Sequence, residues 1–149
     1  MISKILVPTD GSKISQKAAA YAIGLAKQLH ASIIVTSVID YRLLISQTML
    51  VGRFQPDVQE PMGDYLREGA ERHARQIKKL CEKKGVNSKT VITSGHPVEE
   101  IMKLAEKSKV DLIVIGSHGQ SALAAATLGS VTYGVIHKDT TIPILVVKK

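Results

Sequence analysis

Short runs of apolar residues alternate along the chain with longer stretches in which apolar residues recur every three or four positions. The runs cover residues 4–7, 32–38, 90–93, 112–115 and 142–147. The run at 112–115 is continuous, which is typical of a strand buried on both faces of a parallel sheet. The stretches with helical spacing cover residues 12–30, 66–85, 97–108 and 129–137. This alternation predicts an α/β fold, a doubly wound five-stranded parallel sheet with helices on both faces, because right-handed crossovers place the helices there.

Residues that start or stop an element stand at several boundaries of these segments. Pro8 ends the first run, since proline cannot donate to a central strand ladder. Ser12 can cap the helix that follows, and Gly85 is a natural end for a later helix. Between Tyr41 and Met62 the periodicity weakens, and glycine and proline punctuate the chain. We expect this segment to be a long functional or mobile loop, serving as a lid or a partner surface.

The composition indicates one domain. With 149 residues, 44% of them apolar, the chain can bury a sizeable core, and we expect residues 1–149 to form a single domain. The one cysteine, Cys81, excludes an intramolecular disulfide, and its helical apolar spacing predicts a packing residue. The N-terminus enters a strand pattern at once, and apolar runs stay well short of ~20 residues. We therefore expect a cytoplasmic protein without a membrane partner.

The charge of the chain is basic. Lys and Arg outnumber Asp and Glu by 20 to 13, a net charge of +7 that would attract an acidic ligand or nucleic acid. Aromatic residues that could stack on bases make up only 3% of the chain. Between Arg67 and Lys84 the basic residues are interleaved with glutamates. Mixed signs weaken a single-sign field, so this stretch is interpreted as a solvated helix face, and nucleic acid is not an expected partner.

Glycines cluster after the buried run 112–115. Gly116 and Gly119 follow it directly, and Gly129-Ser130 opens the last helical segment. Glycine allows a positive φ or the close approach of a ligand, and the amide groups at a helix start favour an anion such as phosphate. Alternatively, the glycines only turn the chain and Ser130 only caps a helix. These residues by themselves leave both interpretations open.

The expected fold locates this stretch at an edge of the sheet. Ligands of open parallel sheets bind outside the carboxyl ends of the strands, where the strand order reverses. With the strand order 3-2-1-4-5, as in similar nucleotide-binding sheets, the first and fourth strands are neighbours at that reversal. Asp10 and the Gly116 turn are then expected to face one crevice, and Val38 at the end of the second strand would form its adjoining wall.

The glycine spacing Gly116-x-x-Gly119, nine further residues, and then Gly129-Ser130 resembles the ATP-binding signature of the universal stress protein family. The resemblance extends over nearly the whole chain, through residues 7–12, 38–40 and 143–147. It implies that ATP is the ligand. It also implies that the nucleotide-binding residues are Pro8, Thr9, Asp10, Val38, Gly116, His118, Gly119, Gly129, Ser130 and Val131.

The resemblance also implies a role for most of these residues. Asp10 would contact the ribose or the adenine, and the backbone of Val38 would meet the adenine edge. Gly116 and Gly119 would line the ribose and phosphates, while the amides of residues 129–131 and the Ser130 hydroxyl would hold the phosphates. His118 would either contact a phosphate or face solvent. Members of the family also form homodimers through the last strand, and the apolar edge at 144–147 favours the same pairing.

Several features bear on the function without settling it. The resemblance implies a protein that acts in stress response or signalling through nucleotide occupancy. A slow ATPase using Mg²⁺ or Mn²⁺ with the phosphates, and an interaction module without nucleotide, stay open as alternatives.

No residue is assigned a catalytic or metal-ligating role, because Asp10 lacks an identified nucleophile and the histidines are scattered. Among them, His73 is predicted to be a packing or surface residue. Ala122 departs from the glycine that members often carry there, and alanines replace a basic residue that often follows, which would weaken the hold on a triphosphate.

Overall fold

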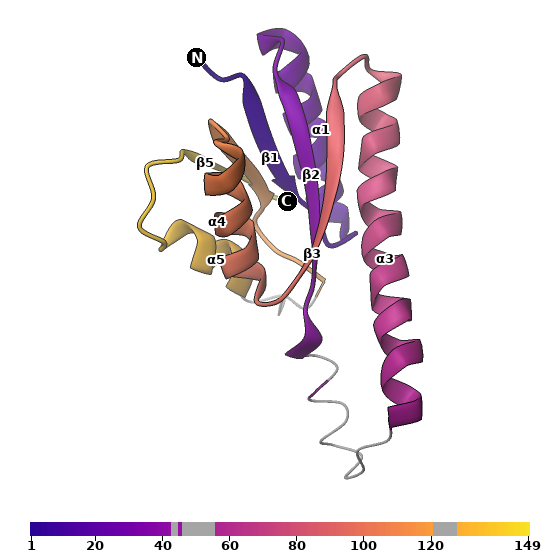
Figure 1. Ribbon diagram of the computed structural model, residues 1–149. Helices are drawn as coiled ribbons and strands as arrows, with labels where there is room; N and C mark the ends of the chain where they lie inside the picture. The colour runs from indigo at the N-terminus through magenta and orange to yellow at the C-terminus, as the bar shows by residue number, and fades with distance from the viewer. Residues whose placement is uncertain (43–44, 46–55, 121–127) are drawn as a thin grey trace.

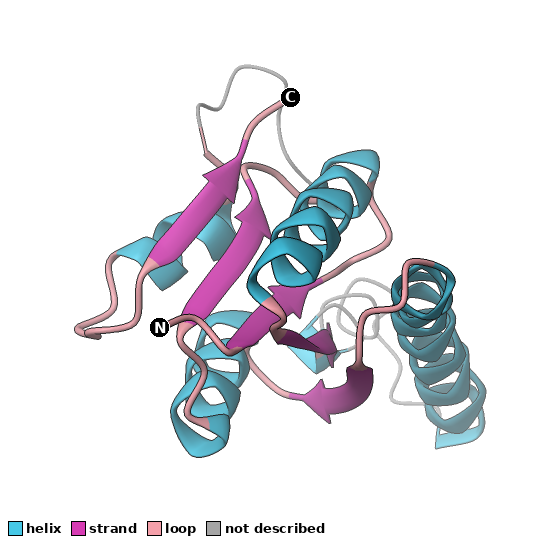
Figure 2. Ribbon diagram, turned by 90° about the horizontal axis from the view of Figure 1, so that it is seen from above, coloured by secondary structure: helices cyan, strands magenta, loops and turns pink. Residues whose placement is uncertain are grey.

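The computed structural model describes residues 1–42, 45, 56–120 and 128–149. Its strands are β1 (Lys4–Pro8), β2 (Ser32–Ile39), β3 (Ser88–Ser94), β4 (Leu112–Gly116) and β5 (Ile144–Val147). All neighbouring pairs are parallel, and the strand order is β3-β2-β1-β4-β5 (Figure 2). The α/β fold and the strand order predicted from the pattern are therefore confirmed.

Helices cover both faces of the sheet (Figure 1). Helices α1 (Lys13–Leu29) and α3 (Pro56–Lys83) pack on one face, and α4 (Pro97–Ser108) and α5 (Ser130–Ile136) pack on the other. Each face has its own buried cluster because side chains of a strand alternate between faces: Ile5 and Val7 point toward α1, whereas Leu6 points toward α4. Burial on both faces, expected for the run at 112–115, is confirmed because every residue of β4 is buried.

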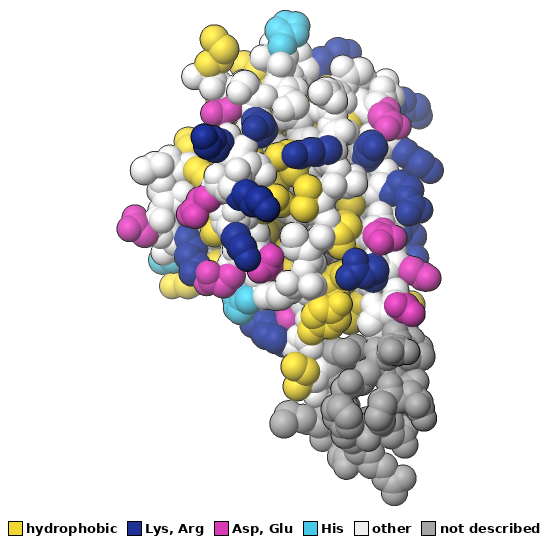
Figure 3. All heavy atoms as spheres, in the orientation of Figure 1, with side chains coloured by type: hydrophobic (Ala, Val, Ile, Leu, Met, Phe, Trp, Pro, Cys, Tyr) yellow, Lys and Arg dark blue, Asp and Glu magenta, His cyan; other side chains and the backbone are white. Residues whose placement is uncertain are grey.

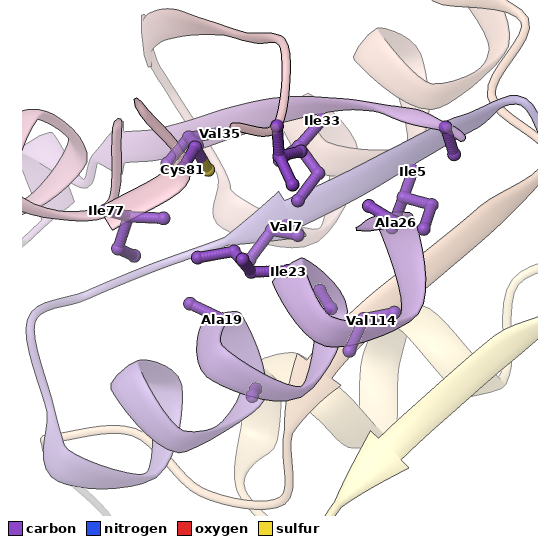
Figure 4. Close-up of a cluster of buried hydrophobic side chains, with 14 of the residues drawn as sticks. Ile5, Val7, Ala19, Ile23, Ala26, Ile33, Val35, Ile77, Cys81 and Val114 are labelled. Atoms are coloured by element: carbon purple, nitrogen blue, oxygen red, sulfur yellow. The ribbon is translucent and has the colours of Figure 1, made fainter. Parts of the chain in front are cut away.

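Small side chains bring α1 close to the sheet. The buried face of this helix carries four alanines, namely Ala18, Ala19, Ala22 and Ala26. Ser12 caps the helix, its Oγ accepting a hydrogen bond from the Ser15 N–H at 3.2 Å, and His30 ends it in the left-handed conformation with a φ of 56°. Figure 4 shows this face next to Ile5 and Val7 of β1. Cys81 of α3 is fully buried in the same cluster, which confirms its packing role.

The start of α3 differs from the expectation. The helix begins at Pro56, well before Leu66, and Tyr41–Arg42 is also helical, so much of the described part of the expected loop is helix. The proline signals there were misleading because Pro56 stands at the first helical position, where a missing N–H costs nothing and a fixed φ suits the helix. The proposed lid or partner role of the segment falls mainly on residues 43–44 and 46–55, which lie outside the described residues.

Candidate functional site

The carboxyl ends of β1 and β4 lie side by side at the point where the strand order reverses. Asp10 follows β1, and its carboxylate Oδ2 accepts a hydrogen bond from the Gln120 N–H at 2.8 Å. The Gln120 side-chain Nε2 donates in turn to the Asp10 carbonyl oxygen at 2.6 Å. These two bonds, which we call the Asp10–Gln120 clasp, join the turn after β1 to the turn after β4. The structure therefore brings together the two segments that were expected to face one crevice.

Close packing explains the glycines of these turns. A Cβ added at Gly119 would lie 2.5 Å from Asp10 Oδ2, and one added at Gly129 would lie 3.2 Å from His118 Cα. The Gly129 N–H donates to the Ser117 carbonyl oxygen at 2.7 Å, so the two glycine turns lie directly on each other. Among the described residues the glycines with positive φ are Gly11, Gly85 and Gly95. At positions 119 and 129 it is therefore the small size of glycine that matters, and not a left-handed backbone.

Gly116 ends β4 at a place where α1 leaves no room for a side chain. A Cβ there would lie 2.8 Å from Ile14 Cγ2 and 3.1 Å from the Ile14 carbonyl carbon. The Gly116 carbonyl oxygen accepts a hydrogen bond from the buried Thr132 hydroxyl at 2.7 Å, which ties α5 to β4. The fold alone thus accounts for this glycine, and its predicted contact with a nucleotide stays a prediction.

Pro8 and Thr9 stand at the end of β1. The Thr9 hydroxyl lies 3.1 Å from Ser15 Oγ and accepts a hydrogen bond from the Gly11 N–H at 3.2 Å. Thr9 is buried, so its side chain shapes the turn and the start of α1. Its predicted role toward a ligand would have to come from its main chain.

β2 extends beyond the end of β1, and the main-chain groups of Val38 lie in this extension, on the side of β2 that faces β1 earlier in the strand. The last paired residues of the two strands are Pro8 and Thr36, and the Thr36 carbonyl oxygen accepts from the Thr9 N–H at 2.8 Å. Residues two apart on a strand direct their N–H and C=O groups to the same side, because the pleat repeats every two residues. Val38 therefore directs a donor and an acceptor to the side of β2 beyond the end of β1, where the crevice was expected.

Ser130 is the first residue of α5 and is exposed, while Gly129 is the residue that caps the helix with a φ of −70° and a ψ of 159°. The interpretation in which Ser130 only caps the helix is therefore wrong. Val131 follows on the same first turn and is partly buried. His118 is half-buried, and its Nδ1 lies 2.8 Å from the Ser117 hydroxyl oxygen.

Two residues near the crevice were missed or interpreted differently from sequence. Gln120 was not singled out, although its position directly after Gly119 was a signal for it. His73 of α3 lies with its ring over Gly11, within 2.6 Å of where a Cβ at that residue would be. Burial and the neighbouring Arg72 hold the pKa of His73 below its ordinary value, while Asp10 opposes that shift. No local pattern indicates this contact, because it joins two elements far apart in the chain.

An ion pair follows β2. The Arg42 guanidinium donates to both carboxylate oxygens of Asp40, at 2.8 Å to Oδ1 and 2.6 Å to Oδ2. This side-chain contact holds the pKa of Asp40 below its ordinary value.

Across the described part of the chain, no three His, Cys, Asp or Glu side chains gather as a metal-ligand set. Ala122 and its neighbours, residues 121–127, lie outside the described residues, so the weaker hold on a triphosphate expected from Ala122 stays a prediction.

Comparison with known proteins identifies the family. The model of the universal stress protein family matches residues 1–148. The chain belongs to the universal stress protein family. Two universal stress proteins of Methanocaldococcus jannaschii are similar along the full chain: MJ0531, 38% identical and covered over 84% of its length, and MJ0577, 35% identical and covered over 96%. Family membership thus rests on the whole sequence.

Solved structures show the same universal stress protein fold. The structure of MJ0577 superposes with a TM-score of 0.84 at 36% identity, covering 100% of this chain and 97% of that one. A universal stress protein in complex with cAMP has a TM-score of 0.71 at 23% identity, covering 98% and 97% of the two chains. A family member from Arabidopsis thaliana with AMP bound has a TM-score of 0.67 at 16% identity, covering 99% and 92%. The last two likenesses show the fold alone.

Among the described residues, every helix is too short or too polar to span a membrane.

Proposed function

We propose that this universal stress protein binds ATP in the crevice between β1 and β4 and acts in cytoplasmic stress response or signalling through nucleotide occupancy. The observation that carries the proposal is the Asp10–Gln120 clasp together with the stacked turns at Gly119 and Gly129. These contacts hold the turns after β1 and β4 together at the carboxyl ends of the strands. Backbone N–H groups of such turns can bind a phosphate group.

The base end of the ligand fits Val38. Its N–H and C=O groups offer one donor and one acceptor in the plane of the sheet, beyond the end of β1. An adenine edge carries the complementary acceptor and donor. Asp10 lies between this position and Gln120, so the ribose would lie beside its carboxylate. Both Asp10 oxygens already accept main-chain bonds, and a carboxylate retains further acceptor sites for a ribose hydroxyl.

The phosphate end of the ligand fits the start of α5. The exposed hydroxyl of Ser130 and the main chain of residues 129–131 lie next to the Gly119 turn. The half-buried His118 belongs to the same turn. Mg²⁺ or Mn²⁺ would enter with the phosphates, which supply oxygen ligands of their own. The cAMP and AMP complexes of proteins with this fold support an adenine nucleotide as the class of ligand. Within that class we propose ATP, because the glycine spacing resembles the ATP-binding signature of the family.

A charge substitution at Ser130 tests the site. Ser130→Asp places a carboxylate where the phosphates would lie, and an acidic residue in the first turn suits a helix, so the fold is expected to be retained. We expect the Kd for ATP, measured by titration calorimetry, to rise at least about tenfold in this variant, the effect of ~1.4 kcal/mol of charge repulsion. Ser130→Asn is the matched control of equal size and no charge, and its Kd should change much less. Equal affinity in the Asp variant and the wild type would refute the proposed phosphate position.

Nucleotide retained during purification gives an independent check. The protein would be purified without added nucleotide and denatured, and the released small molecules would be identified by chromatography and mass spectrometry. ATP is the expected product. A protein that releases nothing and also fails to bind added ATP with Mg²⁺ would overturn the proposal.

We propose further that two copies associate through β5. This strand lies at one edge of the sheet, and Ile144, Leu145 and Val146 are only partly buried there. An apolar strand edge has N–H and C=O groups available for pairing with a second strand. A homodimer formed in this way would continue the sheet from one copy into the other.

A further inference from the structure

His73 fills a space that a side chain at position 11 would otherwise take. Its Nε2, Cδ2 and Cε1 atoms lie 2.4, 2.5 and 2.6 Å from the place of a Gly11 Cβ. Gly11 has a φ of +80°, a conformation that disfavours any other residue. The imidazole of α3 therefore rests directly on the main chain of the turn between β1 and α1.

This turn holds the carboxylate of the proposed nucleotide site. On one side of Gly11, the Ser12 N–H donates to Asp10 Oδ1 at 3.0 Å. On the other side, Asp10 carries the clasp to Gln120. A shift of the Gly11 main chain would rotate Asp10 and lengthen these bonds. The position of the clasp thus depends on what lies over Gly11.

The charges around His73 favour the neutral ring. The ring is half-buried, with Asp10 facing it from the turn and Arg72 next to it on its own helix. Burial is the largest cause that lowers the pKa of His73 from 6.5, and Arg72 lowers it further. At neutral pH the ring is therefore uncharged. A proton would create a cation beside Asp10, which would compete with the Gln120 N–H for the carboxylate.

We propose that His73 is a positioning residue of the nucleotide site: its neutral ring supports Gly11 and keeps Asp10 clasped to Gln120, and its protonation releases the clasp and weakens nucleotide binding. This inference rests on the proposed function, because the affected ligand is the nucleotide of that crevice. It adds α3 to the elements that control the site. It also gives the protein a response to acid.

The test compares the affinity for ATP at two pH values. Binding would be measured by titration calorimetry at about pH 7.5 and about pH 5.5, on either side of the ordinary histidine pKa. The proteins are the wild type, His73→Gln, which is planar and polar but does not titrate, and His73→Ala, which removes the ring. His30→Asn is the control, since His30 ends α1 just before β2, at the amino ends of the strands and so opposite the proposed site, and asparagine tolerates its left-handed conformation. Protonation of ATP itself is common to all four proteins.

The wild type and His30→Asn should lose about fivefold more affinity than His73→Gln between the two pH values, a typical coupling between two groups. His73→Ala should bind more weakly than His73→Gln at neutral pH, because Gly11 loses its support. Identical pH profiles in the wild type and His73→Gln would overturn the inference and leave the proposed function intact. A lower melting temperature with unchanged affinities would likewise show a merely structural role. Failure of the wild type to bind ATP at either pH would overturn both proposals.

Discussion

At the scale of single residues, the glycines of the crevice are set by what packs against them. Gly116 touches the first turn of α1, and Gly119 touches the Asp10 carboxylate. Thr132 then fixes the Gly116 carbonyl oxygen from α5. A glycine near a ligand site is commonly explained by the ligand, but here the protein itself occupies the space. Substitutions at these positions are therefore expected to change stability as well as binding.

Two glycines that both lie in regular elements make a matched pair. Gly116→Ala should lower the free energy of unfolding by about 1–3 kcal/mol, because the new methyl group meets the Ile14 backbone, which cannot move away easily. Gly24→Ala, on the exposed side of α1 with nothing within 4 Å of its Cβ, should instead raise stability by up to about 1 kcal/mol. Urea unfolding followed by circular dichroism measures both. Equal effects of the two substitutions would contradict the packing explanation of Gly116.

At the scale of elements, the end strand β5 predicts the state of association. If its edge pairs with a second copy, the protein should sediment with twice the monomer mass at micromolar concentration. The Ile113 N–H donates to the Pro143 carbonyl oxygen and the Ser117 N–H to the Val147 carbonyl oxygen. Alternate residues of β5 thus direct their main-chain groups to β4, whereas Val146 directs its own to the open edge. Val146→Pro therefore removes an N–H from the edge and should shift the mass toward the monomer. Circular dichroism would show whether the variant stays folded. A monomer mass for the wild type over the working concentration range would refute the dimer.

The elements themselves were largely predictable because their signals are local. Continuous apolar runs, the cap at Ser12 and the stop at Gly85 each act within a few residues, and the helices and strands begin and end close to them. The start of α3 was missed because a proline at a first helical position resembles a proline in a loop. The rule for parallel sheets correctly predicted that the turns after β1 and β4 lie together, but the contacts of Gln120 and His73 were not predicted. Their contacts to residues 10 and 11 depend on how distant segments pack, which no local spacing encodes.

At the scale of the whole molecule, charge is spread over the surface and the sheet is tied at both ends. Figure 3 shows Lys and Arg side chains with Asp and Glu side chains among them on the face in view.

Opposite the crevice, Asp111 Oδ2 accepts hydrogen bonds from the main-chain N–H groups of Ser3 and Lys4, each at 2.9 Å. The Asp10–Gln120 clasp joins the other ends of the same two chain segments. Hydrogen bonds thus join the chain segments of β1 and β4 both before the two strands pair and after they end.

The tie at Asp111 predicts how stability depends on pH. The Ser3 N–H bond is the largest cause that lowers the pKa of Asp111 from 3.8, so the unfolded chain binds a proton more readily than the folded one. The contribution of Asp111 is therefore present above pH 3.8 and is lost as the pH falls through the lower, folded-state pKa. Asp111→Asn should be less stable than the wild type near neutral pH, and the difference should shrink in acid. Denaturant unfolding at several pH values measures this, and a constant difference would contradict it.

The clasp between Asp10 and Gln120 has a consequence for how an occupied crevice could be recognised. Because β1 and β4 are already joined, a ligand does not have to draw the two strands together, and little of its binding free energy is used in reshaping the sheet. The sheet is then expected to look the same to its surroundings whether the crevice is filled or empty. What changes on filling is the exterior at the crevice mouth, where atoms of the ligand replace water. A partner that distinguishes the two states would therefore recognise a composite surface, made jointly by protein and small molecule, and not a rearranged protein.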